Sequence, residues 1–268
     1  MIRLALRVRR ADAEVALAEL LELAPGGVEE VDLPELDAVE YAVYGAPGEL
    51  PALPDLRAAA GGALVDVTTS EVADDWAERW REFHRPVEIG GLTVRAPWHA
   101  AAGGLEVVVD PAQAFGTGAH PTTRLCLELL LGLEARGSLV DAGCGSGVLA
   151  IAASLLGFAP VVALDHDVEA VRAARGNAAV NGVSIDVRRW DLRTDELPRA
   201  DVVLANLLRP LLLELCARMP EAPPVLVASG LLRAEASEVA GAFADRQGLH
   251  ERSRLEDGDW AALLLVRE

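Results

Sequence analysis

From Gly91 to the C-terminus, short apolar runs of strand length alternate with segments of helical periodicity. The apolar runs lie at residues 105–110, 138–143, 161–167, 184–191, 200–208 and 224–232. Most are separated by segments whose hydrophobic residues recur every three or four positions, at residues 122–135, 147–157, 168–182, 211–219 and 233–248. This alternation predicts an α/β domain with a doubly wound, mainly parallel sheet covered by helices on both faces. The closing "WAALLLVRE" predicts a final antiparallel edge strand.

The first sixty-odd residues follow a different pattern. "IRLALRVR" alternates like a half-buried strand, and residues 11–24 have helical spacing that ends at "PGG". Three further strand candidates follow at residues 27–33, 38–45 and 62–69. Strands that flank helices in so short a span predict a small α+β domain of the ferredoxin-like type.

A segment rich in aromatic residues joins the two patterns. In "SEVADDWAERWREFHRP", Trp76, Trp80 and Phe83 fall on one face of a predicted helix that Pro86 ends. These rings either pack a linker helix onto one domain or contribute to a contact surface for a partner. The predicted organisation is therefore a domain at 1–69, a linker helix at 70–86 and a larger domain at 87–268.

Composition narrows the class of protein. No apolar stretch is long enough to span a membrane, and the N-terminus lacks the features of a signal peptide. The net charge of −18 disfavours direct nucleic-acid binding, because phosphate backbones need a basic surface. The acidity either attracts a basic protein partner or serves solubility alone. Cys126, Cys144 and Cys216 show no metal-ligand spacing, so we expect reduced, structural thiols in a cytoplasmic protein with no metal site.

The strongest chemical signal is the glycine-rich segment "DAGCGSGVLAIAA" that begins at Asp141. An apolar strand ends at the aspartate, and a predicted helix begins after Gly147. Gly143, Gly145 and Gly147 permit a tight turn and let a ligand approach the backbone closely. The next predicted strand ends in "ALDHD", with Asp165 at its tip, where a carboxylate can accept both ribose hydroxyls of a nucleoside. This spacing is equally typical of NAD and of S-adenosylmethionine sites.

Sequence similarity narrows the choice. "DAGCGSGVLAIAA" followed by "ALDHDVEAV" resembles the first two motifs of class I S-adenosylmethionine-dependent methyltransferases. Together with "AFGTGAHPTT", "VVLANLL" and "SGLL", these segments closely resemble the ribosomal protein L11 methyltransferase (PrmA) family over nearly the whole chain. The "AFGTGAHPTT" segment is the most specific part, because generic methyltransferases lack it. The resemblance is looser in the first sixty residues.

The resemblance assigns roles to individual residues. It implies that Thr123 contacts the cofactor, that Gly143 lies beside its methionine moiety and that Asp165 binds its ribose. It places Asn206 close to the reacting methyl group, as the catalytic residue. Asp191 lies where this fold often recognises adenine. The stretch containing Phe115 and Thr117 is expected to fold over the site. The predicted S-adenosylmethionine-binding residues are thus Phe115, Thr117, Thr123, Asp141, Gly143, Gly145, Asp165 and Asn206.

The residues after Asn206 bear on the substrate. Methyltransferases that act on amides or base nitrogens often carry an "NPPY"-like tetrapeptide here, whereas this chain has "NLLR". That difference favours a protein amine. The resemblance implies lysine side chains or the α-amine of ribosomal protein L11, free or ribosome-bound, as acceptors, with the small domain as the recognition element of a monomer. Two alternatives remain. The methyltransferase could act on a lysine of another protein or on a small molecule, or the chain could be a nicotinamide-dependent oxidoreductase. His120 is either an ordinary loop histidine or a proton shuttle.

Overall fold

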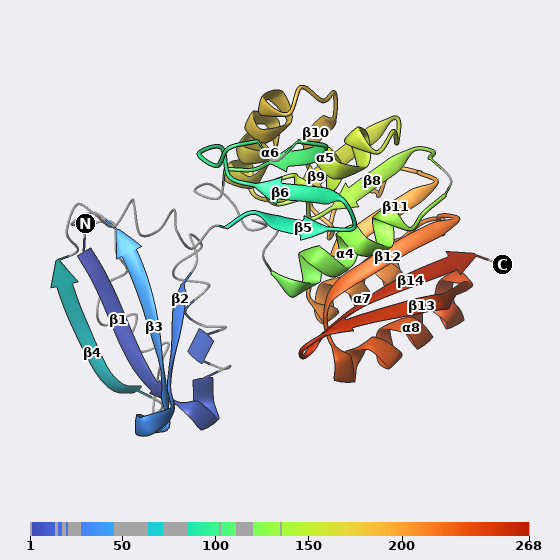
Figure 1. Cartoon of the computed structure of the whole chain (residues 1–268). Coiled ribbons are helices and arrows are strands. Elements are labelled where there is room, and N and C mark those ends of the chain that lie inside the picture. Colours follow the sequence, from blue (N-terminus) through green and yellow to red (C-terminus); the bar gives the residue numbers. More distant parts are fainter. Residues whose placement is uncertain are drawn as a thin grey trace. The chain divides into compact units, whose positions relative to one another are not determined.

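The computed structural model comprises two compact units, Met1–Phe83 and His84–Glu268 (Figure 1). The structure describes residues 2–13, 16–17, 20, 28–45, 64–71, 85–101, 103–110, 120–134 and 136–267. The aromatic residues predicted for the linker helix, Trp76, Trp80 and Phe83, lie outside the described residues.

The first unit contains a four-stranded antiparallel sheet. Its order is β2-β3-β1-β4, and every neighbouring pair is antiparallel, as in a ferredoxin-like sheet. The alternating sequence of these strands directs Leu4, Leu6 and Val8 into a core with Tyr41 and the helical Leu20. The strands are β1 (Ile2–Arg9), β2 (Glu29–Leu33), β3 (Ala38–Gly45) and β4 (Leu64–Glu71).

The first unit departs from the predicted boundary at one point. β4 continues through Ser70 and Glu71, because these residues pair with Arg3 and Ile2 of β1. Strand, and not helix, therefore occupies the first two residues of the segment predicted as a linker helix.

The second unit is built on a seven-stranded sheet of order β10-β9-β8-β11-β12-β14-β13. The first five strands in this order pair in parallel, and β14 pairs antiparallel with both of its neighbours, β12 and β13. The α/β fold predicted from the sequence is confirmed. The strands are β8 (Leu139–Ala142), β9 (Val161–Asp165), β10 (Asp186–Arg189), β11 (Val202–Asn206), β12 (Val225–Leu232), β13 (Leu249–Asp257) and β14 (Trp260–Arg267).

The described helices α4 to α8 cover the two faces of this sheet (Figure 1). One core gathers Leu127, Ile151 and Ala174 of α4, α5 and α6, and a second gathers Leu212 and Phe243 of α7 and α8. The apolar stripes of these helices face the sheet, which explains the periodicity in the sequence. The helices are α4 (Pro121–Leu131), α5 (Val148–Leu155), α6 (Val168–Val180), α7 (Arg209–Arg218) and α8 (Arg233–Gln247).

The last strand of the chain is not at the sheet edge. β14 pairs with β12 on one side and with β13 on the other, so β13 forms the edge. The prediction that the closing residues form an edge strand is wrong in this respect. The burial pattern gives the reason, because Ala261, Ala262 and Leu263 are all buried, as expected of a strand covered on both faces, whereas β13 is mostly exposed.

A separate three-stranded sheet precedes the main domain strands. It consists of β5 (Val87–Ile89), β6 (Leu92–Arg95) and β7 (Leu105–Val108), in that order. β5 pairs antiparallel and β7 parallel with β6. The run at 105–110, grouped with the main-sheet strands on hydrophobicity, thus belongs to this small sheet.

The strand order determines where a ligand can bind. The chain passes from β8 to β9 and β10 on one side, then crosses to β11 and β12 on the other. The direction in which successive strands are added to the sheet thus reverses between β8 and β11, although the two strands are parallel. In open α/β sheets, ligands bind at such a switch point, outside the carboxyl ends of the strands. This edge carries the glycine loop after β8, Asp165 at the end of β9 and Asn206 at the end of β11.

Candidate functional site

The glycine loop forms the floor of the candidate site. β8 is buried along its whole length, and the chain turns at Gly143, Gly145 and Gly147, whose φ angles are 79°, 52° and 82°. These left-handed conformations are readily adopted only by glycine. Gly143 N–H donates to the Leu164 carbonyl oxygen at 2.8 Å, which ties the loop to β9. Gly147 is the N-cap of α5, so backbone N–H groups at this helix start face the loop.

Asp165 is held against the glycine loop by its own carboxylate. One oxygen accepts a hydrogen bond from Gly145 N–H at 2.8 Å, and the other accepts from Asp167 N–H at 3.0 Å. The residue is only 8% exposed. Each carboxylate oxygen has a second lone pair, so both can still accept a hydroxyl. The structure therefore brings the predicted ribose-binding acid next to the loop.

Asp141 lies at the base of the loop and is completely buried. Its Oδ2 accepts from Ala150 N–H in the first turn of α5 at 3.1 Å. Its Oδ1 is buried with no hydrogen-bond partner among the described residues. Burial raises the pKa of the Asp141 carboxyl to about 7, and the nearby charge of Asp165 adds to this rise, while the Ala150 hydrogen bond opposes it. Among the described residues, a buried acid with one unpaired oxygen thus lies beneath the glycine loop.

Asn206 and Thr123 meet at the same edge although 83 positions separate them in sequence. The Asn206 side-chain amide lies 3.5 Å from Thr123 Oγ1. Asn206 ends β11, and Thr123 is buried in the first turn of α4. The amide and the hydroxyl therefore lie together at the end of the sheet that carries the glycine loop.

His120 is the N-cap of α4. Its Nδ1 accepts from Thr122 N–H, at 3.4 Å, and lies 2.8 Å from Thr122 Oγ1. The ring packs edge-on against Trp260, with centroids 4.9 Å apart. Burial lowers the pKa of the imidazole, and the charge of Arg124 lowers it further. A neutral ring that accepts at Nδ1 suits helix capping.

Asp191 lies in a turn after β10. Its Oδ1 accepts from Arg193 N–H at 2.8 Å, and its backbone N–H donates to Asp195 Oδ2 at 2.9 Å. The residue is exposed. It follows Trp190, whose backbone N–H donates to the Asp165 carbonyl oxygen at 2.8 Å. Asp191 is thus near the tip of β9 along the chain, and its suggested role toward adenine stays a prediction.

Asn177 of α6 and Asn181, the C-cap of the same helix, contact the glycine loop, the end of β7 and the segment that follows it. Asn177 is 4% exposed, donates to the Ser146 carbonyl oxygen at 2.9 Å and accepts from Asp110 N–H at 3.1 Å. Asn181 pairs with both the N–H and the carbonyl oxygen of Val108, at 2.8 and 2.7 Å. Asn177 therefore joins the glycine loop to the residue at which "DPAQAFGTG" begins.

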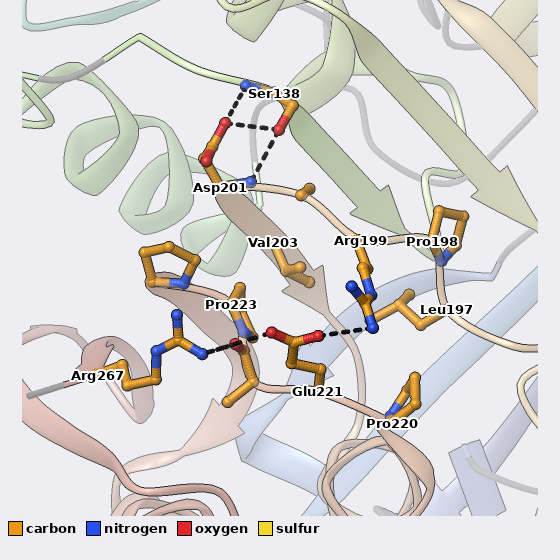
Figure 2. A pocket seen from close by; sticks show the side chains of 13 residues that line it. Ser138, Leu197, Pro198, Arg199, Asp201, Val203, Pro220, Glu221, Pro223 and Arg267 are labelled. Atoms are coloured by element: carbon orange, nitrogen blue, oxygen red, sulfur yellow. Dashed lines mark hydrogen bonds and ion pairs between the residues drawn. The ribbon is translucent and has the colours of Figure 1, made fainter.

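A cavity of about 280 Å³ lies at the amino ends of β8, β11 and β12, at the end of the sheet opposite the glycine loop (Figure 2). Ser138 and Asp201, next to the starts of β8 and β11, form part of its wall, and the Asp201 carboxylate accepts from the Ser138 N–H and hydroxyl at 2.8 and 2.6 Å. Glu221 lies between Arg199 and Arg267, with N···O distances of 3.0 and 3.9 Å. Glu221 thus pairs with both arginines of this cavity, and Asp201 is hydrogen-bonded by Ser138. The cavity is separate from the glycine loop.

Within the described residues, no group of three or more histidine, cysteine or acidic side chains is arranged to hold a metal ion. Among the same residues, no helix has the length and apolar character needed to cross a membrane. All three cysteines are described, buried and without a disulfide partner.

Comparison with known protein families decides the assignment. The family model for ribosomal protein L11 methyltransferase (PrmA) matches residues 55–268. The chain belongs to the PrmA family. The family predicted from the sequence motifs is confirmed.

Individual relatives agree with membership of the PrmA family. A protein described as ribosomal protein L11 methyltransferase from Symbiobacterium thermophilum is 40% identical over 205 residues, covering 72% of this chain and 66% of that protein. One of the same description from Azotobacter vinelandii is 43% identical over 202 residues, covering 71% and 68%. The chain thus spans about two thirds of the length of the curated relatives it matches.

A solved structure also matches. The crystal structure of a ribosomal protein L11 methylase from Lactobacillus delbrueckii subsp. bulgaricus superposes with a TM-score of 0.62 at 27% identity. The match covers 68% of this chain and 98% of that one. The fold class predicted from the strand and helix pattern is therefore confirmed.

Two predicted residues cannot be located relative to this site. Phe115 and Thr117 of the PrmA-like "AFGTG" segment lie outside the described residues. The structure brings together Asp141, Gly143, Gly145 and Asp165 around one loop, and Asn206 with Thr123 beside it.

Sequence reasoning overlooked Asn177 and Asn181. Their spacing of four puts both amides on one face of a helix, which the pattern "NAAVN" already contains. It also left "SGLL" without a role, although Ser229 pairs directly with Asn206 in the sheet. Sheet order, which the sequence does not show, is what brings those two residues together.

Proposed function

We propose that this chain binds S-adenosylmethionine at the carboxyl edge of the seven-stranded sheet and methylates amines of ribosomal protein L11. The observation that carries the proposal is the convergence of two features at one edge. The glycine loop is tied to Asp165, and the Asn206 amide at the end of β11 lies beside Thr123 of α4. Membership of the PrmA family, whose members bear that substrate in their name, supports the same activity.

The residues at this edge suit the proposed cofactor. Asp165 keeps acceptor capacity for ribose hydroxyls, and the left-handed turns at the loop glycines are typical of a strand-to-helix loop that binds a nucleoside-containing cofactor. The buried Asp141 carboxylate supports the base of the same loop through its hydrogen bond from Ala150 N–H. S-adenosylmethionine supplies an already activated methyl group. The task of the protein is therefore to hold and orient the acceptor.

The acceptor amine must lose its proton before it can attack. A lysine with an ordinary pKa near ~10.4 is neutral in only about one molecule in a few thousand at pH 7. A partly buried cleft favours the neutral amine, because desolvation penalises the charged form. The side-chain carbonyl oxygen of Asn206 can then accept an amine N–H and point the nitrogen lone pair toward the methyl group. Solvent receives the proton that leaves the amine.

The first unit supplies the second part of the proposal. We assign residues 1–69 to recognition of the protein substrate, residues 70–86 to a linker and residues 87–268 to catalysis, in a monomeric cytoplasmic enzyme that does not bind nucleic acid directly. The ferredoxin-like sheet with its own core supports an independent recognition element. The net charge of −18 suits a basic protein substrate better than a nucleic acid.

The proposal is tested with the full-length chain, isotope-labelled S-adenosylmethionine and purified ribosomal protein L11. We expect label in the L11 protein, with mass shifts in multiples of one methyl group on amines. Calorimetric titrations with S-adenosylmethionine and with NADH accompany this assay. Labelling of a different protein in a lysate would replace the substrate and keep the chemistry. Binding of NADH without binding of S-adenosylmethionine would refute the methyltransferase.

Two features disfavour the nicotinamide alternative. The domain ends in the antiparallel strands β13 and β14, with β14 inserted between β12 and β13, whereas a dinucleotide-binding sheet continues in parallel. The family match covers the same region, residues 55–268. The sheet and the match therefore support a methyltransferase.

A further inference from the structure

The "SGLL" segment of β12, Ser229–Leu232 in the numbering of the chain, has no role in the chemistry proposed above. It lies where the pairing between β12 and β14 is interrupted, between Ala228 and Leu231. Ser229 stands directly opposite Asn206 in the parallel ladder with β11. The interruption thus falls beside the candidate catalytic residue.

Ser229 connects the two elements that carry Asn206 and Thr123. Its carbonyl oxygen accepts from Leu207 N–H at 3.0 Å, immediately after Asn206. Its hydroxyl lies 3.3 Å from the carbonyl oxygen of Thr122, immediately before Thr123, and 3.1 Å from that of Ala261. Ser229 is fully buried. One residue therefore bonds to the neighbours of both polar side chains at the site.

Gly230 makes room for the backbone that follows Asn206. Its φ is +83°, and a Cβ placed on it would lie 2.5 Å from the carbonyl oxygen and 2.7 Å from the carbonyl carbon of Leu207. The Leu207 peptide thus occupies the space of a side chain at position 230. Backbone cannot rotate away as a side-chain end can, so any larger residue would displace the segment after Asn206.

The Leu207 side chain reaches the other way, to the cofactor loop. Its Cδ2 occupies the space that a Cβ on Gly143 would take. Gly143 follows β8 and Gly230 lies within β12, and both have left-handed φ angles. Leu207 is therefore inserted between two glycines, one in the cofactor loop and one in the neighbouring strand.

We propose that Ser229, Gly230 and Leu207 are positioning residues for methyl transfer. Ser229 and Gly230 set the course of the chain at Leu207, and Leu207 holds the Asn206 end of β11 in register with the glycine loop. This inference rests on the proposed function, since it concerns the separation between an acceptor bound at Asn206 and a donor bound at the loop. Transfer is sensitive to that separation, and a shift of about 1 Å costs about 100-fold in rate.

The first test is Gly230→Ala, with Gly157→Ala as the matched control. Gly157 has a φ of +93° and no atoms within 4 Å of a built Cβ, so its replacement adds the same backbone strain without displacing a neighbour. We expect Gly230→Ala to lower kcat about 100-fold. Its affinity for S-adenosylmethionine, measured by calorimetry, should stay within about 3-fold of wild type, because the loop and Asp165 are unchanged. Gly157→Ala should retain both.

A second variant covers the case in which Gly230→Ala fails to fold. Leu207→Ala removes the contact with Gly143 and leaves the backbone at Gly230 undisturbed. We expect a decrease in kcat of about 10-fold at near-constant cofactor affinity, a smaller loss because the peptide stays in place. Leu207→Met should recover most of the rate, because it restores an apolar side chain of nearly equal volume.

The outcomes separate the inference from the proposed function. Wild-type kcat in folded Gly230→Ala or in Leu207→Ala overturns the positioning role. Equal losses of kcat and cofactor affinity also overturn it, because they indicate general damage to the fold. A wild-type chain that binds no S-adenosylmethionine overturns the proposed function, and the positioning role with it.

Discussion

The Asp165 carboxylate accepts a hydrogen bond from the Gly145 backbone N–H at 2.8 Å. This contact joins the tip of β9 to the middle of the glycine loop. The acid that is predicted to bind the ribose thus also sets the conformation of the loop that is predicted to bind the methionine moiety.

The first prediction concerns Asp165. Asp165→Ala removes both the loop contact and the ribose acceptor, so we expect S-adenosylmethionine affinity to fall about 100-fold or more, the loss of two to three kcal/mol. Asp165→Asn keeps one acceptor oxygen and should give an intermediate loss. Calorimetric titration measures both. Asp186→Ala is the control, since this exposed carboxylate lies at the other end of the neighbouring strand β10. Equal affinities for Asp165→Ala and wild type would refute the assignment.

The second prediction concerns the pH dependence of stability. Asp141 has its pKa raised to about 7 in the folded chain, against about 3.8 in the unfolded chain. The folded state therefore holds a proton that the unfolded state releases between these values, and the unfolding free energy falls as pH rises toward 7. The contribution of Asp141 protonation to the unfolding free energy is fully present below pH ~4 and is lost above pH ~7. It amounts to roughly a few kcal/mol.

Asp141→Asn isolates this contribution, because an amide has no proton to release in this range. We expect the urea midpoint of the variant to fall less than that of wild type between pH 5.5 and about 8. The difference between the two curves is the measurement, since the other titrating groups are common to both. Parallel curves would show that Asp141 is ionised in the folded protein throughout this range.

The third prediction concerns Asn177. Asn177→Ala removes two hydrogen bonds and leaves the Ser146 carbonyl without this donor, so we expect a destabilisation of about 2–3 kcal/mol. Cofactor affinity should fall about 10-fold, because the loop loses its tie to Asp110. Asn181→Ala is the control, since it loses three contacts with backbone groups of Val108 and Asn177 but does not touch the loop. We expect similar destabilisation there with unchanged affinity. Identical affinity losses in the two variants would contradict the role of Asn177.

The fourth prediction concerns Asn206. Asn206→Ala removes the amide that is proposed to orient the acceptor nitrogen, and we expect kcat to fall about 100-fold. Cofactor affinity should change little, because the loop contacts of Asp165 stay intact. Single-turnover rates with labelled cofactor separate the chemical step from binding. Thr123→Val, which removes only the hydroxyl that Asn206 contacts, should lose less. A fully active Asn206→Ala would remove Asn206 from the mechanism.

The fifth prediction concerns His120. Its Nδ1 accepts from Thr122 N–H and caps α4, so His120→Asn should keep the cap and retain turnover within a few-fold. His120→Ala should destabilise the protein by about 1 kcal/mol through loss of the cap. Denaturation midpoints and rates measured across pH 6–9 check both statements. A loss of about 100-fold in His120→Asn would instead support a proton shuttle.

The α/β alternation, the four strands of the first unit and the residues of the glycine loop could all be predicted from the sequence. These features depend on local periodicity and on the conformations that only glycine adopts readily, so they are visible in the order of residues. Asp165 was identifiable for the same reason, because it ends the strand that follows the loop. Family membership followed from the same short segments.

The tertiary structure alone decided which distant residues meet. The insertion of β14 between β12 and β13 depends on burial of Ala261 to Leu263 by helices from elsewhere in the chain. The contact between Asn206 and Thr123 depends on the order of strands in the sheet, and so does the pairing of Asn206 with Ser229. Leu207 reads as an ordinary apolar residue in the sequence. It acquires its place between Gly143 and Gly230 only when β8, β11 and β12 assemble side by side. Packing between such non-local segments leaves no periodic signal in the chain.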